Sequence, residues 1–145
     1  MNSFAERLQK IAQRGQGADA GGANHQDIAA AWVELSLMPT QANSAVDVLQ
    51  LGSLAAQVAG TSLGRFVDAA DFLAGLRNHP AVQDAAEVVR SLWRAEGVMR
   101  RCAGGDDHAH RTAGISTPAE ACRYAGVLAQ TLAMRGRLNE ALPHL

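Results

Sequence analysis

The densest group of side chains that could perform chemistry lies within residues 106–110. Asp106, Asp107, His108 and His110 combine carboxylates with imidazoles, a donor set that suits Zn²⁺, Ni²⁺, Cu²⁺ or Mn²⁺. No HExxH or CxxC motif accompanies them, and aspartate and glycine at such positions also favour ordinary turns. A small metal- or ligand-binding protein, or an enzyme centred on Asp106–His110, is therefore kept as an alternative to the main prediction.

A nucleophilic site requires a thiol or hydroxyl group, a base and an orienting group. Cys102 and His108 supply the first two by residue type, but a cysteine at a helix end is more often a small packing residue. The glycine-rich stretches 15–22 and 60–64 lack the Lys-Ser/Thr pair and the preceding strand of a phosphate-binding loop. The sequence thus identifies no catalytic residue and no cofactor.

Arginines give the region near residues 90–111 a positive bias. They are Arg90, Arg94, Arg100, Arg101 and Arg111. Arg90, Arg94 and Arg101 fall near one helical face, where they could hold a carboxylate-rich partner or a phosphate backbone. Glu87 and Glu96 offset part of this charge, which favours a solvated face. Nucleic-acid binding through the helix near 90–101 is a second alternative, and the sequence disfavours it.

The overall composition is that of one soluble globular domain spanning residues 1–145. Hydrophobic residues make up 48% of the chain and charged residues 19%, and the formal net charge is -1. No uncharged stretch offers the roughly 20 apolar residues that a membrane span requires. A nearly neutral chain has no strong field that would draw it to nucleic acid or to an acidic membrane surface.

The N-terminal residues and the cysteines point to the cytoplasm. Glu6 and Lys10 lie where a signal peptide would need its apolar region, so the segment reads as a short helix. Cys102 and Cys122 are the only cysteines, as expected in a reduced compartment. Their pairing is left open.

The spacing of apolar residues predicts an all-α stack or bundle of about seven helices. Residues 1–23 are expected to form an N-terminal helix and a flexible linker rich in Gly and Ala, and residues 24–145 the helical core. The core is organised around a helical hairpin at 44–76, in which two apolar stripes flank a turn at Gly60 to Gly64.

Start and stop signals outline the rest of the core. Pro39 ends the second helix, and Pro80 suits the first turn of the fifth. Thr117 and Glu120 have the spacing of a capping box that opens a long helix. The preceding interval, residues 104–116, is polar and rich in glycine and is predicted to be a loop.

Two segments share a Gly-Arg pattern that follows one helix and opens another. The matching residues are Gly64, Arg65, Phe66 and Ala69 in one segment, and Gly136, Arg137, Leu138 and Ala141 in the other. At these residues the chain resembles the tetratricopeptide-repeat family. The resemblance implies a stack of α-hairpins with a concave face that accepts a peptide or helix, as in small adaptors and secretion chaperones.

The main functional prediction is a non-enzymatic adaptor or chaperone. It would bind a helical or extended segment of another protein in an apolar groove, or associate with a second copy of itself. The candidate contact residues are Trp32, Phe66, Arg90, Trp93, Arg94 and Arg101. The two tryptophans become contact residues only if the packed helices leave them exposed.

Overall fold

The structure, a computed structural model, describes residues 3–16 and 25–144. These residues form the α-helices α1 (Phe4–Gln16), α2 (His25–Ser36), α3 (Ala45–Ala55), α4 (Phe66–Arg77), α5 (Ala86–Cys102), α6 (His108–Gly114), α7 (Pro118–Met134) and α8 (Leu138–Ala141). Short 3-10 turns form η2 (Pro39–Gln41), η4 (Pro80–Val82) and η5 (Leu142–His144), and a π-helical segment, η3 (Ala56–Ser62), extends α3. No strand occurs in these ranges, and the predicted all-α class is confirmed. The expected Gly/Ala linker lies outside the described residues.

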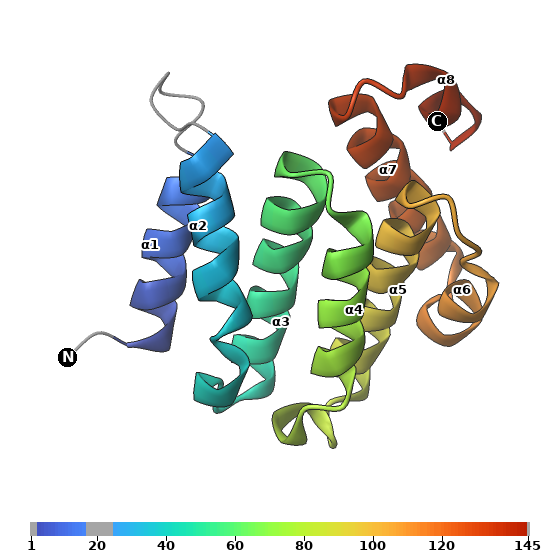
Figure 1. The fold of residues 1–145 in the computed structure, drawn as a ribbon. Coiled ribbons are helices and arrows are strands. Elements are labelled where there is room, and N and C mark those ends of the chain that lie inside the picture. The colour runs from blue at the N-terminus through green and yellow to red at the C-terminus, as the bar shows by residue number, and fades with distance from the viewer. Residues whose placement is uncertain (1–2, 17–24, 145) are drawn as a thin grey trace.

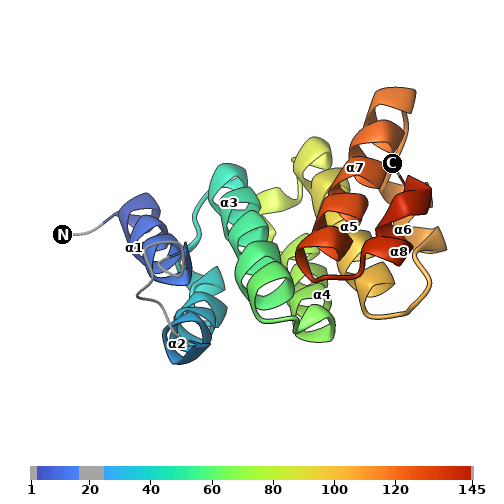
Figure 2. The ribbon, with the colours of Figure 1, turned by 90° about the horizontal axis from the view of Figure 1, so that it is seen from above.

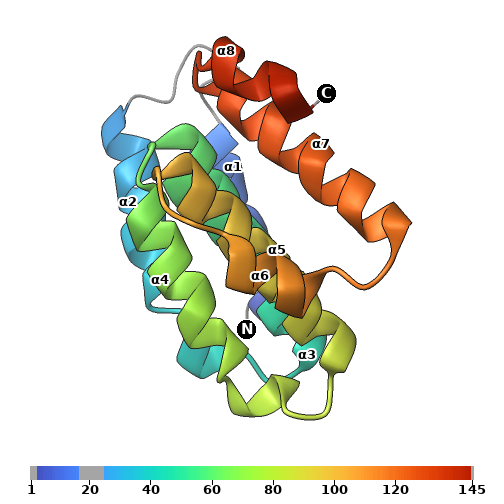
Figure 3. The same cartoon turned by 90° about the vertical axis from the view of Figure 1, so that its right-hand side faces the viewer.

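Helices α1 to α5 stand side by side (Figure 1). Seen from above, α1, α3 and α5 form one row and α2 and α4 the other (Figure 2). Helix α7 packs on α5 and crosses the end of the stack obliquely (Figure 3). None of the helices in the described ranges is long and apolar enough to cross a membrane.

The core contains the predicted hairpin. Val48, Leu51 and Ala55 of α3 face Ala69 and Leu73 of α4, and all five are fully buried. They recur at intervals of three or four residues, so each helix presents one continuous apolar stripe. Burying a leucine or valine side chain contributes about 1.5–3 kcal/mol, and this hairpin is therefore a main source of stability.

Side-chain caps fix where two helices begin. The Ser44 hydroxyl accepts a hydrogen bond from the backbone N–H of Asp47 at the start of α3, and Thr117 accepts one from Glu120 at the start of α7, both at 3.1 Å. The Glu120 carboxylate accepts from the backbone N–H and the hydroxyl of Ser116. The expected capping box would place that carboxylate on the cap residue's own N–H, so its contact is shifted by one residue.

The polar interval 104–116 is not simply a loop, because α6 occupies residues 108–114. This short helix is the one that the prediction of about seven helices omits. It has no apolar stripe of its own. Gly114 rests against the backbone of α5, where a Cβ atom would lie 3.1 Å from the carbonyl oxygen of Arg90. Close packing on α5 thus supplies the stability that local sequence does not.

The two Gly-Arg segments have the same backbone geometry. Gly64 and Gly136 have φ angles of 71° and 76°, a conformation that glycine adopts without steric cost. The next residues, Arg65 and Arg137, have φ/ψ angles of -88°/65° and -99°/56° and immediately precede helices. The sequence similarity thus corresponds to a turn that the chain uses twice.

The second of these turns also joins three parts of the molecule. Arg135 donates hydrogen bonds to the carbonyl oxygens of Thr61 and Ser62, and Arg137 donates to that of Cys102. These carbonyls lie at the C-terminal ends of η3 and α5, where they have no partner within their own helix. The turn between α7 and α8 therefore caps two other helices.

Candidate functional site

Three residues of the predicted metal site, Asp106, Asp107 and His108, border one hollow beside α6, whereas the fourth, His110, does not. Asp107 is buried and accepts a 2.6 Å hydrogen bond from the hydroxyl of Tyr124. His110 faces α5, whereas Asp106 and His108 are exposed. Within the described ranges, no three His, Cys, Asp or Glu side chains are grouped closely enough to hold a metal ion. The predicted donors therefore form no metal-binding group of three in the described part of the chain.

Asp107 and Tyr124 join the start of α6 to α7. Burial, together with the hydrogen bond to the carboxylate of Asp107, raises the pKa of Tyr124 far above its usual range. The hydroxyl therefore stays protonated and continues to donate to Asp107. The guanidinium group of Arg111 lies 5.7 Å from the centre of the Tyr124 ring. This arrangement is suited to holding α6 in place.

The most buried carboxylate in the described chain is Glu96 of α5. Its Oε1 accepts a 2.9 Å hydrogen bond from Arg77, while its Oε2 lies 2.9 Å from Nε2 of His110 and 3.3 Å from Arg100. The Arg77 guanidinium also lies 3.4 Å from the centre of the Trp93 ring. The cluster ties α4, α5 and α6 together. The signal for it in the sequence is an acidic residue within the apolar stripe of α5.

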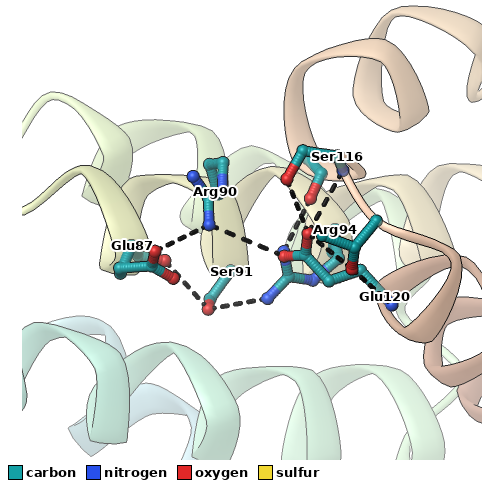
Figure 4. Close-up of polar contacts among 8 residues, drawn as sticks. Glu87, Arg90, Ser91, Arg94, Ser116 and Glu120 are labelled. Carbon is teal, nitrogen blue, oxygen red and sulfur yellow. Dashed lines mark hydrogen bonds and ion pairs between the residues drawn. The ribbon is translucent and has the colours of Figure 1, made fainter.

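Two of the three candidate arginines on α5 are paired with carboxylates (Figure 4). Arg90 lies 2.7 Å from Glu87, and Arg94 lies 2.6 Å from Glu120. Hydrogen bonds from Ser116, and after them the charges of the two arginines, lower the pKa of Glu120 to about 2. Arg90 and Arg94 are therefore occupied within the chain, which leaves less positive charge for a phosphate backbone.

Two of the three aromatic candidates are buried, and the third, Trp93, is half-buried. Trp32 is buried, and its ring is 5.3 Å from that of Phe72 in an edge-to-face arrangement. Phe66 is also buried, and Trp93 lies beneath Arg77. None of the three lines the hollows described next. Arg101 is exposed near α8, where it lines a separate hollow.

An open apolar hollow of about 370 Å³ lies between α3, α5 and α7. Its apolar lining is Leu49, Gly52, Leu92, Ala95, Val98, Tyr124 and Val127, and its polar lining is Ser53, Ser91, Arg94 and Arg123. Val127 is 47% exposed although it is an apolar residue. Small side chains at Ser53, Ser91 and Ala95 leave this space unfilled. It has the volume and lining that are typical of binding sites.

A second, shallower hollow of about 570 Å³ continues from the first toward α1. It lies between α1 and α3, and its walls include Leu8, Ala12 and Leu54 together with Gln9, Gln50 and Gln57. Leu49 and Ser53 border both hollows. We call the two together the apolar groove. No aspartate or glutamate lines it among the described residues.

The predicted groove and the observed one share a single contact residue, Arg94. The prediction placed half of its contacts on large aromatic side chains, of which Trp32 and Phe66 are buried and Trp93 is half-buried. A better signal is the small residues Ser53, Ser91 and Ala95, whose short side chains do not reach across the space that α3, α5 and α7 enclose. Gly52 has a different role, because it allows Leu92 to pack closely against α3.

The two cysteines are both free, and Cys102 is buried while Cys122 is exposed. Burial raises the pKa of the Cys102 thiol to about 11. At about pH 8.5, where an ordinary thiol is half ionised, iodoacetamide should modify only Cys122 in the folded chain, since the thiolate is the reactive form. Mass spectrometry should show one adduct before unfolding and two after it. Two adducts on the folded chain would show that Cys102 is accessible.

Neither a protein family, nor a curated protein, nor a solved structure matches the chain significantly. The geometry of the apolar groove is therefore the basis for assigning a function.

Proposed function

We propose that this protein is a non-enzymatic adaptor or chaperone that binds a helical or extended segment of a partner protein in the apolar groove. The observation that carries this proposal is the pair of joined hollows along α1, α3, α5 and α7, with an apolar floor and an uncharged or cationic rim. Contiguous apolar surface that is rimmed by polar residues is typical of protein interaction sites.

The chemistry of the groove supports binding better than catalysis. The titratable or nucleophilic groups among its lining residues are Ser53, Ser91, Tyr124 and two arginines. The Ser91 hydroxyl donates to the carbonyl oxygen of Glu87, and the Tyr124 hydroxyl donates to Asp107. A base within reach of a nucleophile is what general-base catalysis requires, and no histidine or carboxylate lines the groove within the described chain.

Filling the groove tests the proposal. Ser53 is exposed and borders both hollows, so Ser53→Trp should block them without disturbing the core. Peptides of about 15 residues, selected from a random display library on the wild-type chain, should bind Ser53→Trp at least about tenfold more weakly, because contact area is lost.

Ser36→Trp is the matched control. Ser36 is exposed at the end of α2, in the row that does not border the groove, and its substitution should leave peptide binding unchanged. Circular dichroism should show the same helix content in both variants. A library that enriches no peptide, or peptides that bind Ser53→Trp as tightly as wild type, would contradict the proposed function.

A further inference from the structure

We propose that the occupant of the apolar groove is an amphipathic helix of a partner protein that carries a carboxylate opposite Arg123. This inference rests on the proposed function and specifies the chemistry and conformation of the bound segment. It follows from the hydrogen-bonding capacity of the groove, from the charges on its rim and from its extent across the helices.

The hydrogen-bonding capacity favours a helix over an extended segment. Every residue that lines the groove belongs to a helix, and backbone groups in the middle of a helix already have partners within it. An extended peptide would bring its own unpaired N–H and C=O groups onto a largely apolar floor, where each unpaired group costs about 1–3 kcal/mol. A helix pairs its own backbone groups and presents only side chains.

The aromatic content of the groove also argues against a proline-rich ligand. Such ligands dock into grooves lined by several aromatic residues. Tyr124 is the one aromatic side chain that lines the apolar groove in the described chain, and its hydroxyl is engaged by Asp107.

The rim charges indicate where an acidic residue of the partner belongs. Arg94 and Arg123 are the charged side chains that line the groove within the described residues. Arg94 is paired with Glu120. Arg123 is exposed on α7, and the described chain offers it no ion pair or hydrogen bond. A glutamate or aspartate at the α7 end of the bound helix would supply its missing partner.

The extent of the groove sets the length of the occupant. It runs from α7 across α3 to α1, and neighbouring packed helices lie about 8–10 Å apart. Two to three such spacings amount to roughly 16–30 Å, and a helix of about 15 residues falls within that range, because at 1.5 Å per residue it is about 22 Å long. We expect apolar residues at i, i+3 or i+4, and i+7 along its inner face.

Sequencing the peptides enriched on the wild-type chain tests this inference. They should share helical apolar spacing and at least one Glu or Asp. Arg123→Glu should weaken binding of an enriched peptide about tenfold, because attraction is replaced by repulsion, and the peptide's own Glu→Lys change should restore it. Arg101→Glu is the control, because Arg101 is also an exposed arginine but lies outside the groove.

The outcomes separate this inference from the proposed function. Peptides that depend on Ser53 but lack helical spacing, or that bind Arg123→Glu as well as wild type, would overturn the inference and leave the proposed function standing. Concentration-dependent dimers that Ser53→Trp abolishes would identify a second copy of the chain as the occupant and would also overturn it. If no selected peptide depends on the groove for binding, both the inference and the proposed function are overturned.

Discussion

Replacement of Glu96 by alanine should lower the free energy of unfolding by about 3–5 kcal/mol, the usual cost of removing one partner from a buried ion pair. The side chain of Glu96 is only 4% exposed and contacts Arg77, Arg100 and His110. Without the carboxylate, Arg77 keeps its place over Trp93 but has no negative partner there. Urea denaturation followed by circular dichroism measures the change.

Glu87→Ala is the matched control for this substitution. Glu87 also lies on α5 and pairs with an arginine, but its side chain is 81% exposed. Solvent and salt screen exposed pairs, so Glu87→Ala should cost no more than about 1 kcal/mol. If Glu96→Ala is no more destabilising than Glu87→Ala, the carboxylate does not hold α4, α5 and α6 together.

Substitution of Gly97 by valine should destabilise the protein by about 2–3 kcal/mol through overpacking. A Cβ atom at this position would lie 2.7 Å from both Cβ of His110 and the hydroxyl oxygen of Tyr124. Both neighbours are constrained, because His110 contacts Glu96 and Tyr124 donates to Asp107. We therefore expect α6 to move away from α5, with faster amide hydrogen exchange at residues 108–114.

A second helical glycine provides the comparison. A Cβ atom at Gly126 of α7 would meet no atom within 4 Å. Gly126→Val should therefore change stability by no more than about 0.5 kcal/mol, since glycine and valine differ only modestly in helix propensity. Equal effects of the two substitutions would show that α6 does not depend on close approach at Gly97.

The sequence predicts the helices well because their signals are local. The Thr117 cap of α7 and the two apolar stripes of the hairpin at 44–76 are visible without tertiary information, and the structure confirms them. The helix that the prediction omits, α6, has no such local signal. Its stability comes from the contact of His110 with Glu96 and of Asp107 with Tyr124. Each contact joins α6 to another helix, so the sequence around α6 does not reveal it.

The location of the groove was harder to predict for a related reason. Large aromatic side chains are common at binding sites, and their residue type alone suggested Trp32 and Phe66. Packing of the helices has buried both side chains. A hollow forms where side chains are too small to fill the space between helices, as at Ser53 and Ala95. Which small residues face one another depends on helix packing, and periodicity along one helix does not reveal it.

The most direct test of binding in the apolar groove uses nuclear magnetic resonance. Chemical shifts of methyl groups are compared before and after a selected peptide is added to the full chain. If the peptide binds in the groove, the methyl signals of Leu49, Val98 and Val127, which line it, should shift. The methyl signals of Val33 and Val67, which are exposed on α2 and α4, should stay unchanged. Shifts confined to Val33 and Val67, or to residues 106–110, would show that the peptide binds outside the groove and would contradict the proposed function.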